Sequence, residues 1–118
     1  MSQSPPRSTA VGRLVHAMRR LGFGSALRYD FARARRALGI APAVVTLTAR
    51  QSRFNLSARP SSTDFIVFGQ TFVSEPYACL VELPNVEFIV DCGANVGFAS
   101  AFLLSHFPRA SGFAIVPD

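Results

Sequence analysis

The chain has 118 residues, 49% of them hydrophobic, and a net charge of +5 in which every basic side chain is an arginine. This length suits one small domain and is too short for two, and the apolar content argues against a disordered protein. No stretch approaches the roughly 20 apolar residues that a membrane-spanning helix needs, and no apolar core of a secretory signal follows the first charged residues.

The charge is divided unevenly along the chain. Residues 1–59 hold eleven arginines against a single aspartate, a net charge of +10. Residues 60–118 hold one arginine against six acidic side chains, a net charge of −5. Within the basic half the helical spacing ends before residue 43. We divide the chain there into an arginine-rich helical segment, 1–42, and a second part, 43–118, which begins with a β-hairpin and continues into an α/β domain.

Two short amphipathic helices are predicted in the arginine-rich segment, after a polar, proline-bearing tail at 1–10. The apolar positions of the first helix, which recur at helical spacing, are Val11, Leu14, Val15, Met18 and Leu21. Gly22 and Gly24 then interrupt the pattern, and Ser25 can cap a second helix. The apolar stripe of that second helix is Leu27, Phe31, Ala34 and Leu38. We expect its arginines to face out, namely Arg28, Arg35 and Arg36.

Three roles are open for this segment. The arginines can simply be solvated on a helical cap, or the helices can lie on a membrane surface that carries anionic lipid. Nucleic-acid binding is the third role. We expect no nucleic-acid partner, because aromatic side chains are not interleaved with the arginines as a stacking surface requires. The first 29 residues contain no acidic side chain, so they also match a transit peptide weakly.

A β-hairpin is predicted over residues 43–60, which alternate between apolar and polar side chains and turn near Gln51 and Ser52. The apolar residues of this alternation are Val45, Leu47, Ala49, Phe54, Leu56 and Ala58. Ser62 or Thr63 can then cap a short helix. The apolar residues of that helix are Phe65, Phe68 and Phe72.

An apolar run at 88–90 predicts a short buried strand, because nothing polar interrupts it and β-branched residues dominate. Asp91 ends the run, a Gly-x-x-x-Gly loop follows at 93–97, and the next segment is typical of a helix that ends at Phe107. A second apolar run occupies 112–116. Strand, glycine loop, helix and strand form a βαβ unit, and such units bind nucleotides at the carboxyl end of the first strand.

The residue types of the loop fit a ligand site. Gly93 lets a ligand approach the main chain closely. Gly97 opens the helix, where free N–H groups and the positive dipole end favour a carboxylate or phosphate. Asp91 can accept hydrogen bonds from an ammonium group, and Asn95 is a candidate helix N-cap. Such a site suits a zwitterionic amino-acid tail better than a pyrophosphate, which Asp91 would repel.

A family resemblance rests on the same residues. Residues 90–98 are Val-Asp-Cys-Gly-Ala-Asn-Val-Gly-Phe, and residues 113–118 are Phe-Ala-Ile-Val-Pro-Asp. These segments resemble the opening of the FkbM-type S-adenosylmethionine-dependent methyltransferases. The stretch 61–72, with Tyr77, is similar to the lead-in of that family, so the resemblance covers residues 59–118.

The resemblance implies a truncated Rossmann-like methyltransferase fold, of which this chain holds the first βαβ unit. It also implies S-adenosylmethionine as the cofactor. The cofactor-binding residues that it implies are Asp91, Cys92, Gly93, Ala94, Asn95 and Gly97. By the same analogy, Asp64, Gln70 and Tyr77 either edge the cofactor pocket or simply pack and cap.

The reaction that the resemblance implies is methyl transfer to a hydroxyl group of a small-molecule or glycan acceptor, such as a sugar or a natural product. The protein would mainly hold cofactor and acceptor in line, and a general base would remove the hydroxyl proton. We assign no residue of this chain to that base. Two other functions stay open: a non-catalytic remnant or nucleotide-binding module, and an arginine-rich adaptor at a membrane surface.

Two departures from the family pattern stand out. The family ends its second strand with Glu-Pro-Asp, where the glutamate accepts hydrogen bonds from the cofactor ribose; this chain has Val116 there, with Asp118 two residues on. Losing that charge-assisted partner costs about 1.5–3 kcal/mol. The family also continues with further strands and helices. We therefore expect a truncated chain with an unpaired sheet edge, a poorly covered sheet face and marginal stability.

The cysteines and one histidine carry weaker predictions. Cys79 and Cys92 are expected to be buried thiols in a reducing compartment, so we expect a cytoplasmic protein. Two cysteines without metal-ligand spacing make no zinc site, and no metal is expected. His106, late in the last helix, is expected to interact with the helix dipole rather than to act in catalysis.

Overall fold

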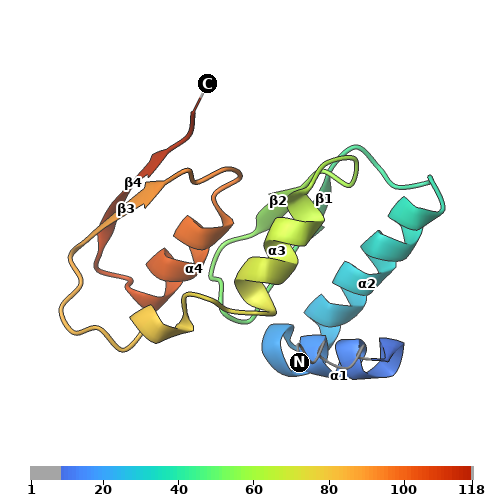
Figure 1. The fold of residues 1–118 in the computed structure, drawn as a ribbon, viewed down its shortest axis with the longest axis horizontal. Coiled ribbons are helices and arrows are strands. Elements are labelled where there is room, and N and C mark those ends of the chain that lie inside the picture. The colour runs from blue at the N-terminus through green and yellow to red at the C-terminus, as the bar shows by residue number, and fades with distance from the viewer. Residues whose placement is uncertain (1–8, 118) are drawn as a thin grey trace, which may run out of the picture.

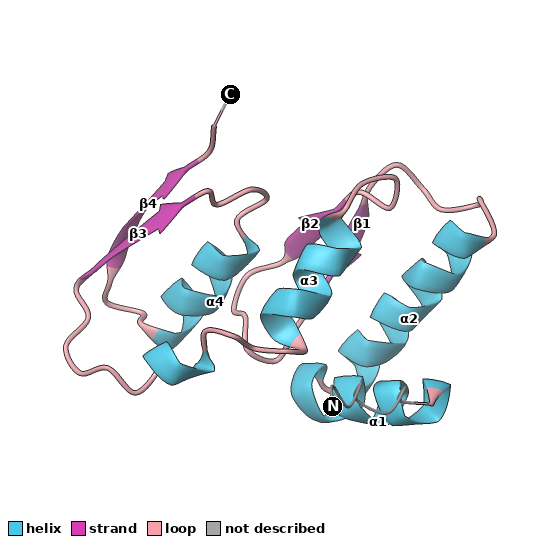
Figure 2. Ribbon diagram, viewed as in Figure 1, coloured by secondary structure: helices cyan, strands magenta, loops and turns pink. Residues whose placement is uncertain are grey.

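The computed structural model describes residues 9–117. Figures 1 and 2 show two N-terminal helices, a small hairpin, a central helix and a strand–helix–strand unit in chain order. The elements are α1 (Ala10–Leu21), α2 (Phe23–Ala37), β1 (Val45–Leu47), β2 (Leu56–Ala58), α3 (Asp64–Phe72), the 3₁₀ turn η1 (Ala78–Leu80), β3 (Phe88–Cys92), α4 (Phe98–His106) and β4 (Ser111–Ile115). This mixture of helix and sheet agrees with the predicted α/β class.

Helix α1 forms where the apolar spacing predicts it. Thr9 caps it, because its side chain accepts a hydrogen bond from the Gly12 N–H over 3.2 Å. Of the predicted stripe only Leu21 is buried; Leu14 and Met18 are half-buried, and Val11 and Val15 are exposed. Ala17, which the prediction did not include, is buried as well. The rest of the predicted tail, residues 1–8, lies outside the described residues.

Helix α2 is present, but the prediction of its buried face is wrong. The predicted stripe is exposed, and the residues that are buried instead are Ala26, Tyr29 and Ala32. The two alanines allow close packing, and the Tyr29 hydroxyl donates to the Phe65 carbonyl over 3.0 Å. The predicted cap is also wrong: the helix begins after Gly22, and the Ser25 hydroxyl lies 2.8 Å from that of Thr48.

The hairpin is confirmed, with β1 and β2 antiparallel and Leu47 opposite Leu56. Leu47, Leu56 and Ala58 are buried. The strands are shorter than the alternating pattern, so Phe54 falls in the connecting loop and is exposed, which corrects its assignment to the pattern.

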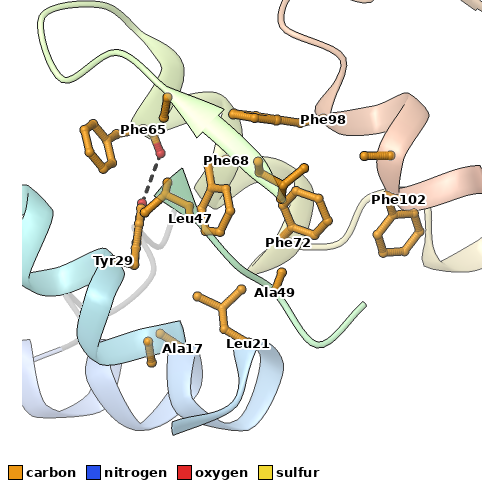
Figure 3. Close-up of a cluster of buried hydrophobic side chains, with 14 of the residues drawn as sticks. Ala17, Leu21, Tyr29, Leu47, Ala49, Phe65, Phe68, Phe72, Phe98 and Phe102 are labelled. Carbon is orange, nitrogen blue, oxygen red and sulfur yellow. Dashed lines mark hydrogen bonds between the residues drawn. The ribbon is translucent and has the colours of Figure 1, made fainter. Parts of the chain in front are cut away.

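The core is built around α3, whose three phenylalanines are buried as predicted (Figure 3). Phe68 lies 5.1 Å from the ring of Tyr29 and 5.8 Å from that of Phe98 on α4, measured between centroids. The ring centroid of Phe72 lies 6.1 Å from that of Phe102, also on α4. One buried cluster therefore joins the arginine-rich helices, the hairpin and the βαβ unit.

Strands β3 and β4 are parallel, from Phe88 opposite Ser111 to Cys92 opposite Ile115, and α4 connects them. The predicted βαβ unit is therefore present. The prediction that the first strand is buried is wrong: Phe88 and Val90 are exposed, and β4 is exposed throughout. Helix α4 packs on one face of this two-stranded sheet, and no helix lies over the other face in Figure 1.

Both cysteines are exposed and free, so the prediction of buried thiols is wrong. Cys92 is the last residue of β3 and lies on the exposed side of that strand. Cys79 lies on η1, where its thiol is 3.7 Å from the Pro76 carbonyl oxygen. His106 lies in the last turn of α4 and donates from Nδ1 to the Phe102 carbonyl over 2.8 Å. Between residues 9 and 117, no helix combines the length and apolarity needed to cross a membrane.

Candidate functional site

A cavity of about 490 Å³ opens beside the carboxyl end of β3. One wall comes from α3 and the turn after it, and the other from the loop between β3 and α4. The residues of the first wall are Val67, Gln70, Thr71, Ser74, Pro76 and Tyr77. The residues of the second wall are Asp91, Cys92, Gly93, Ala94, Asn95 and Ala99.

Most residues suggested by the family resemblance meet in this cavity. Five of the six implied cofactor-binding residues line it, and the sixth, Gly97, does not. Gln70 and Tyr77 line it as well, although they come from a different part of the chain. Asp64 lies elsewhere, so two of the three residues of the lead-in reach the cavity.

Asp64 is instead a structural residue at the start of α3. It is buried, and its Oδ2 accepts from the Arg59 backbone N–H over 2.8 Å and from the Arg59 Nε over 3.0 Å. The hydrogen bond from the Arg59 guanidinium holds the pKa of the Asp64 carboxyl below its usual value. Thr63 occupies the predicted N-cap position of α3, but its side chain makes no capping hydrogen bond. The Ser62 hydroxyl accepts instead from the Asp64 N–H over 3.1 Å.

The loop after β3 takes an unusual backbone path. Gly93 and Gly97 have φ of 79° and 81°, and Asn95, a non-glycine residue, has φ of 50°. A Cβ at either glycine would meet no atom within 4 Å, so the backbone angle and not the available space requires glycine there. Gly97 is the residue at the N-cap position of α4, which corrects the assignment of Asn95 as the cap.

The amides of this loop are largely occupied by the protein itself. The N–H groups of Gly93 and Ala94 both donate to the Ile115 carbonyl, over 2.8 and 3.0 Å, and the Gly97 N–H donates to the Ala94 carbonyl. These bonds fasten the loop to the end of β4. No hydrogen bond is recorded for the N–H groups of Asn95 and Val96 within the described residues. Amide donors for a ligand can therefore come from these two groups and from the first turn of α4; Asn95 and Ala99 line the cavity.

Asp91 is held in place by a residue that the sequence did not single out. The Ser100 hydroxyl, on the first turn of α4, donates to Asp91 Oδ2 over 2.5 Å. Within the part of the chain that the structure describes, Asp91 Oδ1 has no hydrogen-bond partner. One oxygen of this half-buried carboxylate is thus oriented by the protein, and the other remains able to accept from a ligand.

The position expected to face the ribose offers no hydrogen-bond acceptor side chain. Val116 directly follows β4 and is exposed. Asp118, the nearest acidic alternative in the sequence, lies outside the described residues.

A second cavity, of about 290 Å³, lies between α1, α2 and α3. Gln70 and Ser74 line both cavities, so the two are neighbours across the outer side of α3. Arg13, His16 and Arg33 add basic side chains to the second cavity, and Asp30 is the acidic residue in its wall. The His16 Nε2 donates to the Val73 carbonyl over 3.2 Å. No sequence pattern predicted this cavity, because it depends on how three helices pack.

None of the protein-family models, curated proteins or solved structures compared with the chain matches it. Residues 9–117 contain no group of three or more side chains able to hold a metal ion. The interpretation of the first cavity therefore depends on its own residues and on the resemblance of residues 90–98.

Proposed function

We propose that this chain carries the cofactor-binding part of a Rossmann-like, S-adenosylmethionine-dependent methyltransferase of FkbM type. It acts in the cytoplasm on a hydroxyl group of a small-molecule or glycan acceptor. The observation that supports the proposal is that Asp91 to Asn95 share one cavity with Gln70 and Tyr77, which belong to the separate lead-in stretch. A volume of about 490 Å³ is also within the range of small-molecule sites.

Asp91 would bind the ammonium group of the cofactor. Its Oδ2 is taken by Ser100, so Oδ1 is the oxygen that would accept from the ligand. The cofactor carboxylate would lie at the N-terminus of α4, where unpaired N–H groups and the helix dipole favour an anion. The bound cofactor supplies an electrophilic methyl group, and the protein contributes its position.

The ribose end of the cofactor fits this chain less well. Val116 offers no acceptor to the ribose hydroxyls, so binding would be weaker there by about 1.5–3 kcal/mol than with a carboxylate. This residue favours a second candidate function, a nucleotide-binding module that holds the cofactor without transferring its methyl group. The two functions differ in whether a bound cofactor is turned over.

The acceptor would occupy the second cavity, beyond Gln70 and Ser74. These two polar residues line both cavities, so a hydroxyl group near them would lie next to the cofactor site. Arg13 and Arg33 in the same wall suit an acceptor that carries an anionic group, such as a sugar acid or a sugar phosphate.

Calorimetric titration of the full chain with S-adenosylmethionine tests the proposal. We expect binding, and Asp91→Asn should weaken it about ten- to hundredfold, because a charged hydrogen bond to the ammonium group is lost. Glu82→Gln removes the same charge from an exposed residue outside the cavity and should leave the affinity unchanged. Equal affinities of the wild-type chain and Asp91→Asn would contradict the assignment of Asp91.

A further inference from the structure

Helix α2 carries a continuous apolar face that points away from the core. We call it the outer face of α2, and its large residues are Phe23, Leu27, Phe31 and Leu38. Their side chains are 66, 45, 65 and 73% exposed, respectively. Spacings of four, four and seven residues place them on one side of the helix, with Leu38 at its C-cap, opposite Ala26, Tyr29 and Ala32.

This arrangement is unusual for a surface helix, which normally turns polar residues to the solvent. Both sides of α2 are apolar, and only the side with Tyr29 packs against the protein. Among the described elements none buries these four side chains, and α2 itself lies at the margin of the molecule (Figure 1). A contiguous exposed apolar surface of this kind indicates a binding partner.

The charges beside the outer face indicate what kind of partner fits it. Arg28 and Arg35 follow one edge, and the Arg35 guanidinium lies 5.7 Å from the centre of the Phe31 ring. Along residues 1–59 the only acidic side chain is Asp30, which is partly buried. An apolar stripe with arginines at its edge complements a surface that is apolar inside and anionic outside, as an anionic lipid layer is.

We propose that α2 lies flat on a membrane that contains anionic lipid, with its outer face among the acyl chains and Arg28 and Arg35 among the headgroups. Long arginine side chains reach the headgroups while their aliphatic parts stay at the apolar boundary. A symmetric dimer through this face is less suitable, because it would bring Arg28 and Arg35 of both copies into one interface. A nucleic acid would leave Leu27 and Leu38 facing water.

The uncovered face of the β3–β4 sheet provides a matched comparison. Phe88 and Phe113 are 53 and 67% exposed, much as Leu27 and Phe31 are, but they belong to the acidic half of the chain. Exposure alone would make both faces bind lipid, whereas the proposal requires only the outer face of α2 to do so.

Sedimentation of the full chain with phosphatidylcholine vesicles, with and without phosphatidylglycerol, tests the proposal. We expect binding only when phosphatidylglycerol is present, and loss of binding at high salt. Leu27→Gln/Phe31→Gln should reduce the bound fraction at least about tenfold, and Arg28→Gln/Arg35→Gln should do the same at low salt. Phe88→Gln/Phe113→Gln should change it little. Circular dichroism checks that each variant folds.

A fluorescence measurement places the bound face directly, because the chain contains no tryptophan. Phe31→Trp should shift its emission to the blue when anionic vesicles are added, and Phe113→Trp should not. The proposal is overturned if the chain ignores anionic vesicles at low salt, or if both tryptophans respond alike. It is also overturned if the chain dimerises without lipid and Leu27→Gln/Phe31→Gln separates the dimer. None of these results depends on cofactor binding.

Discussion

The hydroxyl of Ser100 donates a hydrogen bond to Oδ2 of Asp91 over 2.5 Å and thereby ties the first turn of α4 to the end of β3. This bond determines which carboxylate oxygen is available in the cavity. A serine three residues after the second glycine of the loop is therefore part of the proposed site, although it binds no ligand itself.

Replacing Ser100 by alanine should weaken S-adenosylmethionine binding about fivefold, because ordering a carboxylate that Ser100 no longer orients costs about 1 kcal/mol on binding. Ser105→Ala, on the same helix, is the control. Ser105 bonds to the Ala101 carbonyl and to the Arg53 N–H, and it does not line the cavity. Calorimetry should show a weaker affinity only for Ser100→Ala. Equal losses of affinity in the two variants would mean that any disturbance of α4 weakens binding, and would contradict a specific role of the Ser100–Asp91 bond.

Introducing a glutamate at Val116 should strengthen S-adenosylmethionine binding by about 1.5–3 kcal/mol, because the ribose hydroxyls would gain a charged acceptor. Val44→Glu is the control: both valines are 55% exposed and neither lines the cavity, but only Val116 follows β4, where the family pattern has its ribose acceptor. An unchanged calorimetric affinity of Val116→Glu would mean that the ribose does not lie next to residue 116.

Gly69 allows α2 and α3 to pack closely. A Cβ there would stand 2.8 Å from the Tyr29 hydroxyl oxygen, which is held by its bond to Phe65. Gly69→Ala should therefore reduce the free energy of unfolding by about 1–3 kcal/mol in urea titrations. Gly24→Ala, in a helix position where a Cβ meets nothing within 4 Å, should not destabilise the protein.

The Gly69 prediction has an internal check. Tyr29→Phe removes the atom that the new methyl group would meet, so Gly69→Ala should cost less in the Tyr29→Phe background than in the wild type. Additive losses in the double variant would show that the Tyr29 hydroxyl is not the obstacle.

The Arg59–Asp64 ion pair makes stability depend on pH. The folded pKa of Asp64 lies below the ordinary value of 3.8, chiefly because of its hydrogen bond from Arg59. Its contribution is therefore fully present above that ordinary value and is lost as the pH falls through the folded pKa. In urea titrations near neutral pH, Arg59→Gln should have a lower free energy of unfolding than the wild type. This difference between the two proteins should shrink once the pH falls below the ordinary pKa of an aspartate. A constant difference at every pH would contradict this coupling.

Periodicity predicted the elements that bury one side only. The spacing of Phe65, Phe68 and Phe72 was enough to find α3 and its buried face, and alternation was enough to find the hairpin around Leu47 and Leu56. The βαβ unit followed from the glycine loop between two apolar runs. In these cases local pattern and tertiary packing agree.

The misses share a physical cause, which is that burial depends on neighbours far along the chain. Helix α2 has two apolar sides, and spacing alone did not show which of them is buried. Tyr29 packs inward, where its hydroxyl donates to the Phe65 carbonyl, a partner 36 residues along the chain. Strand β3 is apolar but has a cover on only one face in the described structure. The amides of Gly93 and Ala94 are bound by the Ile115 carbonyl, a partner that only the fold reveals.

The most direct test of the central claim is to map where S-adenosylmethionine binds. Backbone amide chemical shifts of the full chain, recorded during a titration with the cofactor, report the contact region residue by residue. The proposed site predicts that the largest shifts fall on residues 91–100 together with Gln70 and Tyr77. Saturable shifts confined to other residues, or no shifts at all, would contradict it.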